Sequence, residues 1–237
     1  MRATLAEKRT VAKGTLLCVF DLGGEEVDFE PGQYFFVTLL DPPYEDEKGP
    51  RRHITVVTSP SERGVLGFAT RLRDSAFKRS VAELEVGAQV EVEPPKGSFV
   101  LPADDGGRAL VFVAGGIGIT AFRSMLRYID EQGLLHRVTL LYSNRSVEET
   151  AFLDELRELE SRAEWFRLVL TMTDDPTWPG ESRRIDATFF GDHLGDRVRD
   201  ATYMIAGPPP MVDAITAALA EAGVPEEQVV PERYSGY

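Results

Sequence analysis

Residues 109–121 have the sequence ALVFVAGGIGITA, and this stretch decides the fold of the second half of the chain. Its first seven residues carry no charge, which is typical of a strand covered on both faces of a parallel sheet. Counted from Gly116, the following turn has the spacing Gly-x-Gly-x-x-Ala and opens a helical segment. Similar apolar runs, separated by helical segments, recur at 137–143, 166–173 and 201–207. This alternation predicts an α/β domain with a doubly wound parallel sheet.

The first hundred residues have a different pattern, in which short segments rich in β-branched and aromatic residues lie between glycines and prolines. Strands are expected at 32–40, 52–58, 65–72 and 88–93, and a short helix is expected near 75–84. The close spacing of the strands predicts an all-β barrel or sandwich. The pattern changes after a polar, glycine-bearing stretch. We therefore expect a β domain over residues 1–103 and the α/β domain over residues 104–237.

Charge and cysteine content argue against several classes of function. The chain has 237 residues and a formal net charge of −13, which disfavours nucleic acid and anionic membrane surfaces as partners. Cys18 is the sole cysteine and the three histidines lack zinc-site spacing, so we expect no metal centre. The charged start of the chain and the lack of a run of about 20 apolar residues predict a cytoplasmic protein. Any redox chemistry would therefore have to come from a bound organic cofactor.

Two glycine turns predict a dinucleotide site. Gly116 and Gly118 allow the main chain to approach a pyrophosphate, whose charge the following helix amino terminus favours. The fourth strand of this half ends at Gly207 and Pro208, and parallel strands end at the same edge of a sheet. The alternative is a pair of tight strand–helix turns that hold no ligand.

The end of the second strand bears on the choice of nucleotide. Ser143 and Asn144 offer no carboxylate for the ribose diol of NAD, and Arg145 suits the extra phosphate of NADP. Arg183 and Arg184 are further candidates for the same pocket. We expect NADP to be preferred over NAD. The alternative is that Arg145 is an ordinary solvated side chain.

Six segments of the chain, in the right order, resemble those of the ferredoxin–NADP reductase family. They are Pro31-Gly32-Gln33-Tyr34, Arg52-His53-Ile54-Thr55-Val56-Val57-Thr58, Pro95-Lys96-Gly97-Ser98-Phe99, the glycine turn at 115–120, Ala206-Gly207-Pro208-Pro209 and Glu232-Arg233-Tyr234-Ser235-Gly236-Tyr237. The second segment is similar to the family's flavin motif, Arg-x-Tyr/Phe-Ser/Thr-x-x-Ser. The resemblance implies a flavin-binding barrel followed by an NAD(P)-binding domain. It also implies FAD as the cofactor, with FMN the less favoured choice.

The resemblance implies roles for individual residues. Arg52 would pair with flavin phosphates, and Thr55 would place its hydroxyl near the flavin nitrogen that accepts hydride. The expected flavin-binding residues are Tyr34, Arg52, His53, Ile54, Thr55, Thr58, Phe68, Thr70, Ser75, Lys78 and Tyr234. Those expected for the nicotinamide nucleotide are Gly115, Gly116, Gly118, Thr120, Ser143, Asn144, Arg145, Gly207 and Pro208. The expected catalytic residues are Thr55, Glu232 at the nicotinamide pocket, and Tyr237 over the flavin.

The chain departs from the family pattern at two positions. Ile54 replaces an aromatic residue that usually lies against the flavin ring, so stacking would come from Tyr34 or the carboxyl terminus. Ala206 replaces a cysteine that many members place beside the nicotinamide. Hydride transfer depends mainly on holding two rings in contact, so this change is expected to tune the rate.

Three interpretations of function follow. The first is a reductase that passes electrons from NAD(P)H through FAD to an acceptor such as ferredoxin or another small redox protein. The second is a reductase of small molecules such as free flavin or ferric chelates, which the acidic charge favours slightly because ferredoxins are also acidic. The third is a non-enzymatic nucleotide-binding subunit, against which the flavin motif argues.

Overall fold

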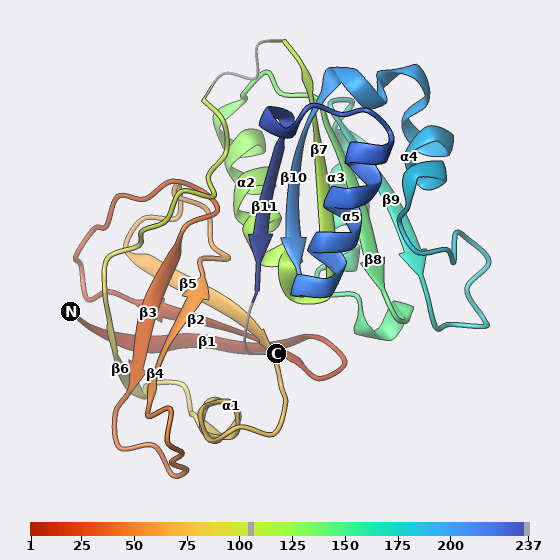
Figure 1. Ribbon diagram of the computed structural model, residues 1–237. Helices are drawn as coiled ribbons and strands as arrows, with labels where there is room; N and C mark the ends of the chain where they lie inside the picture. Colours follow the sequence, from red (N-terminus) through yellow and green to blue (C-terminus); the bar gives the residue numbers. More distant parts are fainter. Residues whose placement is uncertain (104–106, 235–237) are drawn as a thin grey trace. The chain divides into compact units, whose positions relative to one another are not determined.

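The computed structural model describes residues 1–103 and 107–234, which group into two units (Figure 1). The first unit contains Met1–Leu101 together with Thr120–Gly133. The second contains Pro102–Ile119 and Leu134–Tyr237. The helix that follows the glycine turn therefore groups with the strands of the first unit. The predicted division into domains after residue 103 stays a prediction.

The first unit is built on a six-stranded antiparallel sheet with the order β4-β3-β6-β1-β2-β5. Its strands are β1 (Arg2–Ala12), β2 (Thr15–Asp21), β3 (Tyr34–Leu39), β4 (Arg51–Thr55), β5 (Val65–Arg71) and β6 (Gln89–Val92). In β3 the side chains alternate, so that Phe35, Val37 and Leu39 are buried in the core. This period of two is what the sequence pattern of a half-buried strand predicts.

A corner between β4 and β5 brings the two edges of this sheet together. The chain leaves β4 after Thr55, before the predicted end of the strand at residue 58. The N–H of Val56 donates to the carbonyl of Gln33 at 2.9 Å, and the N–H of Val57 donates to the carbonyl of Gly67 in β5 at 2.8 Å. Because β4 and β5 are the outer strands, the corner joins them as a barrel requires. The predicted β-barrel class is confirmed.

Helix α1 (Ala76–Glu83) is fixed at both ends. Ser75 is its N-cap and accepts a hydrogen bond from the N–H of Lys78 at 3.3 Å. At the other end, the ammonium group of Lys8 in β1 donates to the carbonyl of Ala82 at 3.0 Å and to that of Leu84. A cation at a helix carboxyl terminus is favoured by the helix dipole. The predicted short helix is confirmed, and its amino terminus has a fixed position on the barrel.

The second unit is built on a five-stranded parallel sheet with the order β11-β10-β7-β8-β9. Its strands are β7 (Ala109–Gly115), β8 (Val138–Asn144), β9 (Phe166–Met172), β10 (Ala201–Gly207) and β11 (Val229–Arg233). The α-helices of the second half are α2 (Ile119–Gln132), α3 (Leu153–Arg162), α4 (Ala187–Leu194) and α5 (Pro209–Glu221). Short 3-10 turns are η1 (Gly116–Gly118), η2 (Val147–Glu149), η3 (Gly195–Asp200) and η4 (Glu226–Gln228).

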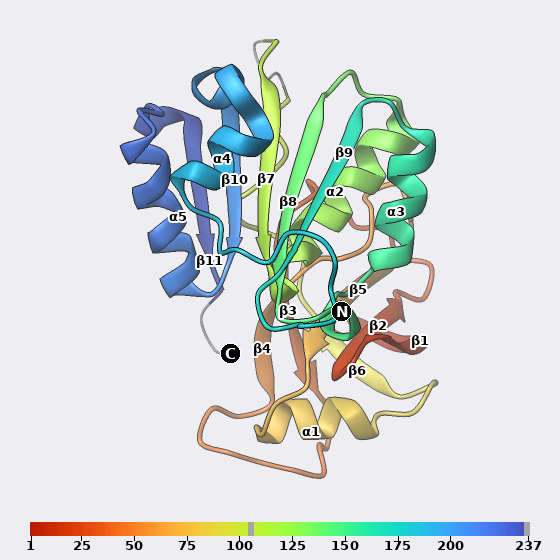
Figure 2. The same ribbon diagram turned by 90° about the vertical axis from the view of Figure 1, so that its right-hand side faces the viewer.

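Helices cover both faces of the parallel sheet. Helices α4 and α5 pack on one face, where Val111 and Val113 of β7 meet Phe190 and Ile215, and α3 lies on the other face (Figure 2). The predicted doubly wound sheet is therefore confirmed. The fifth strand, β11, was not predicted, because Pro231 and the charges at its end obscure the apolar pattern.

No bilayer-spanning candidate occurs among the helices within residues 1–103 and 107–234, since none combines the necessary length with the necessary apolar character.

Glycines at the carboxyl edge of the parallel sheet allow two turns, after β7 and after β10, to pack closely against each other and against α5. A Cβ atom at Gly118 would collide with the carbonyl of Ala206 at the end of β10. One at Gly115 would collide with the sulfur of Met211 in α5, and one at Gly207 would lie 3.3 Å from Cα of Gly115. Close packing of main chain against main chain therefore requires these glycines, whatever ligand the edge binds.

Replacing Gly118 by alanine should destabilise the second unit. The added methyl group meets main chain that has little room to move, and overpacking of this kind costs about 1–3 kcal/mol. Gly191→Ala in α4 is a matched control, because nothing lies within 4 Å of its would-be Cβ. The control should be neutral or stabilise the helix by up to about 1 kcal/mol. Denaturant unfolding of both variants is the measurement, and equal stabilities would contradict the packing argument.

Candidate functional site

Four cations gather where β5 ends and α1 begins. Arg71 is the last residue of β5, Arg73 lies two residues further on, Lys78 is in the first turns of α1, and Arg52 is in β4. We refer to Arg52, Arg71, Arg73 and Lys78 as the cationic cluster. Burial, followed by the positive charges of Arg73, Arg52 and Arg71, lowers the pKa of Lys78 to about 8. Each of the three arginines is therefore close enough to Lys78 to disfavour its positive charge.

A cavity of about 300 Å³ lies at the cationic cluster. Its lining residues are Leu72, Arg73, Asp74, Lys78, Arg79 and Ala82. The amino terminus of α1 offers free N–H groups here, and a helix amino terminus favours negative charge. Clustered cations that repel one another are stabilised by an anion with more than one charge. These residues fit a pyrophosphate group such as that of FAD.

Arg52 has partners of its own in the chain. Its guanidinium donates to the carbonyl of Gly49 at 2.7 Å and to that of Lys48 at 3.0 Å, and it lies 3.4 Å from the carboxylate of Asp46. These contacts hold the arginine on the side of β4 that faces Phe77 of α1, whose ring centre lies 5.2 Å from the guanidinium carbon. The role predicted for Arg52 at the flavin phosphates stays a prediction.

The flavin motif divides its side chains between the two faces of β4. Thr55 lies opposite Tyr34 in the neighbouring strand, and His53 lies opposite Phe36. The ring of His53 is 5.6 Å from that of Tyr34 and meets it edge to face. Ile54 instead packs against the barrel core. The structure therefore groups Tyr34, His53 and Thr55 on one face, with Arg52 and Ile54 on the other.

Three residues of the predicted flavin set belong to the barrel interior. Phe68 is fully buried and stacks on Phe20 with ring centres 5.7 Å apart. The hydroxyl of Thr58 accepts a hydrogen bond from the N–H of Gly67 at 3.2 Å, and Thr70 is buried as well. The side chains of Phe68 and Thr58 thus have structural partners. The resemblance made Phe68 and Thr70 candidates, whereas in the structure they belong to the run of buried residues inside β5.

The predicted nucleotide residues of the second unit lie along one edge of the parallel sheet. Gly115 at the end of β7 pairs with Ser143 near the end of β8, and Ala206 in β10 pairs with Ala114 of β7. Gly207 follows Ala206, and Pro208 is the N-cap of α5. Gly116 has a φ of 53°, a conformation that glycine adopts without strain. Thr120, in the first turn of α2, is buried.

The end of β8 carries two polar side chains with different surroundings. The guanidinium of Arg145 is exposed, and within the described residues no hydrogen bond or ion pair engages it. The side-chain amide of Asn144 is buried, and its nitrogen and oxygen lack partners in the part of the chain that the structure describes. A buried amide of this kind is normally satisfied by a water molecule or a ligand. The edge therefore offers one free cation and one free amide.

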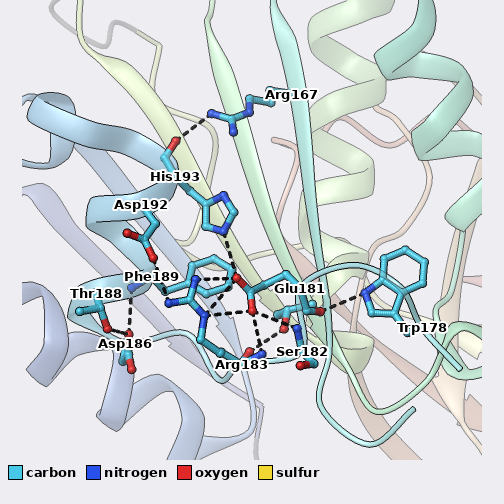
Figure 3. A network of polar contacts seen from close by, with 11 residues as sticks. Arg167, Trp178, Glu181, Ser182, Arg183, Asp186, Thr188, Phe189, Asp192 and His193 are labelled. Carbon is cyan, nitrogen blue, oxygen red and sulfur yellow. Dashed lines mark hydrogen bonds and ion pairs between the residues drawn. The ribbon is translucent and has the colours of Figure 1, made fainter. Parts of the chain in front are cut away.

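Arg183 is not available to the nucleotide pocket for which it was a candidate. Its guanidinium donates to both carboxylate oxygens of Glu181, the shortest contact being 2.6 Å, and to Asp192 of α4 at 2.9 Å (Figure 3). The hydrogen bonds from Arg183 lower the pKa of Glu181 to about 2. His193 lies 3.6 Å from the same carboxylate. The network balances the charge of Arg183 within the chain, although Arg183 and Arg184 are both exposed.

The predicted residues near the carboxyl terminus reach the same sheet edge in part. Glu232 in β11 pairs with Ala206, and burial raises the pKa of its carboxyl group. The N–H of Tyr234 donates to the carbonyl of Gly207 at 2.9 Å, and its side chain is buried. Tyr237 lies outside the described residues. The structure thus brings Glu232 beside the glycine turns, while the catalytic roles stay predictions.

The sequence analysis missed Arg71 and Arg73, which supply half of the cationic cluster. The pattern Arg71-x-Arg73, separated from the N-cap Ser75 by one residue, Asp74, was the available indication, because it places both cations near a helix amino terminus.

Family comparisons match most of the chain. Residues 2–101 match the model of the oxidoreductase FAD-binding domain, and residues 112–217 match that of the oxidoreductase NAD-binding domain. The reductase component of propane 2-monooxygenase from Gordonia sp. strain TY-5 is 28% identical over 219 residues, which cover 89% of this chain. The reductase component of phenol 2-monooxygenase from Pseudomonas sp. strain CF600 is 29% identical over 212 residues, or 87% of this chain. The chain spans 60% and 58% of these two relatives.

A solved structure has the same fold along the whole chain. It is a ferredoxin NADP⁺ reductase from Neisseria gonorrhoeae with bound FAD and NADP, which superimposes with a TM-score of 0.81 at 21% identity and covers 98% of each chain. At this identity the likeness supports the fold alone. Together with the two domain matches, in the order FAD-binding then NAD-binding, it shows that the chain belongs to the ferredoxin–NADP reductase-like family of oxidoreductases.

Proposed function

We propose that this chain is a reductase that takes hydride from NAD(P)H onto FAD and passes the electrons to a separate redox partner. The cationic cluster at the amino terminus of α1 carries the proposal, because it fits the pyrophosphate of FAD in a domain that matches FAD-binding proteins. FAD, when bound, supplies the conversion between a two-electron donor and one- or two-electron acceptors. The relatives that are reductase components of monooxygenases support a protein acceptor of that kind.

The residues of the chain would bind and orient rather than exchange protons. Lys78, Arg73 and the helix N–H groups would hold the diphosphate, and Thr55 would place a hydroxyl that does not titrate beside the flavin ring. The edge formed by Gly115, Gly207 and their neighbours would hold the nicotinamide nucleotide. Positioning of two rings is the main requirement of hydride transfer.

A reductase of free flavin or ferric chelates is the second candidate. The net charge of −13 favours it, because an acidic protein acceptor would be repelled over most of the surface.

The purified protein should be yellow and should release FAD on denaturation. NADPH added without oxygen should bleach the flavin, because hydride transfer reduces it. Reoxidation of the bleached protein by a small redox protein, compared with a ferric chelate and with free flavin, then separates the two candidates. A colourless protein that takes up neither FAD nor FMN would contradict the proposed function.

The affinity of the apoprotein for FAD should fall as the pH rises above about 8. In the apoprotein Lys78 loses its proton around its lowered pKa of about 8, so at higher pH the diphosphate lacks this cation or must first restore its proton. The loss is at most about tenfold per pH unit for a single proton. Flavin fluorescence titrations between pH 7 and 10 measure it. Lys78→Arg, which stays charged, should flatten the profile, whereas the surface change Lys96→Arg should leave it as in the parent.

The same pKa shift makes the apoprotein more stable as the pH rises, whereas it weakens FAD binding. Between about pH 8 and 10.5 the folded chain holds fewer protons on Lys78 than the unfolded chain does. The contribution of Lys78 to stability therefore rises with pH in this window. A flat FAD profile in the parent, or an equal fall in Lys78→Arg, would show that Lys78 does not bind the diphosphate.

NADPH should be preferred over NADH, and Arg145 should be a main reason. One charge-assisted contact between its free guanidinium and the extra phosphate is worth about 1.5–3 kcal/mol, or roughly ten- to a hundredfold in kcat/KM. Glu148 and Glu149, three and four residues further on, offset part of this charge. Arg145→Ala should remove the preference, and Arg184→Ala, an equally exposed arginine, should keep it. Equal use of both nucleotides by the parent would show that Arg145 is only a solvated residue.

A further inference from the structure

Helix α2 holds the end of the flavin motif through side chains on one of its faces. Nη1 of Arg123 donates to the carbonyl of Val57 at 2.8 Å, and Oγ of Ser124 donates to the carbonyl of Thr58 at 2.7 Å. Further along the same face, Arg127 pairs with Glu62 at 2.8 Å. All of these residues belong to the first unit. The helix is therefore attached to the motif by directional bonds to main chain.

The burial of these donors is costly unless they have a specific task. Arg123 is only 6% exposed and Ser124 is fully buried. A buried guanidinium needs hydrogen bonds to offset its desolvation, and an apolar side chain would pack a helix against a barrel at lower cost. A hydrogen bond from an arginine to a carbonyl fixes the position and direction of that peptide group, which an apolar contact does not do.

Residues 57 and 58, whose carbonyls α2 binds, are also held by Gly67 of β5. The N–H of Val57 donates to the carbonyl of Gly67, and the hydroxyl of Thr58 accepts from the N–H of Gly67. A Cβ atom at Gly67 would lie 2.9 Å from the side chain of Thr58, so the corner and β5 are in close contact. Residues 57 and 58 thus have little freedom to move. Thr55, which ends β4, lies only two residues before them.

We infer that Arg123 and Ser124 are positioning residues of the flavin site. By fixing the carbonyls of Val57 and Thr58 they set the path of the chain that carries Thr55, and through it the contact of the threonine hydroxyl with the flavin. This inference rests on the proposed function, since it assumes that the motif binds FAD. The effect of either residue on the flavin passes through the main chain and requires no contact with the cofactor.

The test compares Arg123→Met, Arg123→Lys and Ser124→Ala in the complete flavin-loaded protein. The readouts are the midpoint potential of the flavin, its visible absorption and circular dichroism, and the rate of anaerobic reduction by NADPH. Arg123→Met and Ser124→Ala should shift the potential and the spectrum and slow reduction by about ten- to a hundredfold, as a misplaced reacting group does. Arg123→Lys keeps a donor and should recover part of the loss.

Arg127→Met is the matched control. It removes a cation from the same face of α2, but its ion pairs are with Glu62, beyond the end of the motif, and with Glu131 of the same helix. This variant should lower thermal stability and leave the potential and the spectrum as in the parent. If Arg123→Met does not fold, Ser124→Ala decides the matter, because it removes one hydroxyl and little volume.

Two failures can be told apart. A parent protein that takes up no flavin would overturn the proposed function and the inference with it. A flavin-loaded parent whose Arg123 and Ser124 variants lose only thermal stability, with unchanged potential, spectrum and reduction rate, would overturn the inference alone. In that case the two residues would be structural anchors of α2.

Discussion

The corner at residues 56–58 is the constraint on which most of the first unit depends. Its N–H groups join the two outer strands of the sheet, and its carbonyls accept the buried donors of α2. Every polar main-chain group there must have a partner, because an orphaned buried carbonyl or N–H is costly. The same few atoms thus close the barrel, anchor a helix from further along the chain and set the end of the predicted flavin motif.

The fold was predictable from sequence because the strands of the two halves have different patterns of apolar and polar residues. The uncharged run at 109–115 and the alternation at 88–93 gave correct strand positions in two different kinds of sheet. Two features could not be foreseen. The turn away from β4 after Thr55 depends on hydrogen bonds to Gln33 and Gly67, which are distant in sequence. The grouping of α2 with the first unit likewise depends on contacts such as that of Arg123 with Val57, 66 residues apart.

The candidate site was predictable only where a motif fixes the chemistry. Ser75 and Lys78 follow from a helix start, where Ser75 is the N-cap of α1 and Lys78 lines the adjacent cavity, and their role at an anion stays a prediction. Arg183 shows the limit of such reasoning, because a cation in a loop looks the same whether it is free or paired with Glu181 and Asp192. Phe68 shows another, since a core residue and a residue lining a cofactor have the same hydrophobic character. Burial and pairing separate these cases, and both are properties of the folded chain.

The network around Glu181 has a consequence for how this protein can change over time. The chain between β9 and α4 is long, but Glu181 pairs with Thr171, and its carbonyl accepts hydrogen bonds from the N–H of Met172 and the indole of Trp178. One long loop is thereby divided into two short ones, and the entropy lost on closing each is small. Residues 174–180 form the first of them, and the N–H of Asp174 donates to the carbonyl of Arg145. Two side chains of this segment have structural partners, since the indole of Trp178 belongs to the anchor and the carboxylate of Asp175 accepts the N–H of Val147. The exposed positions of the segment that take no part in these contacts, such as the side chain of Asp174, can therefore change over time at little cost to folding.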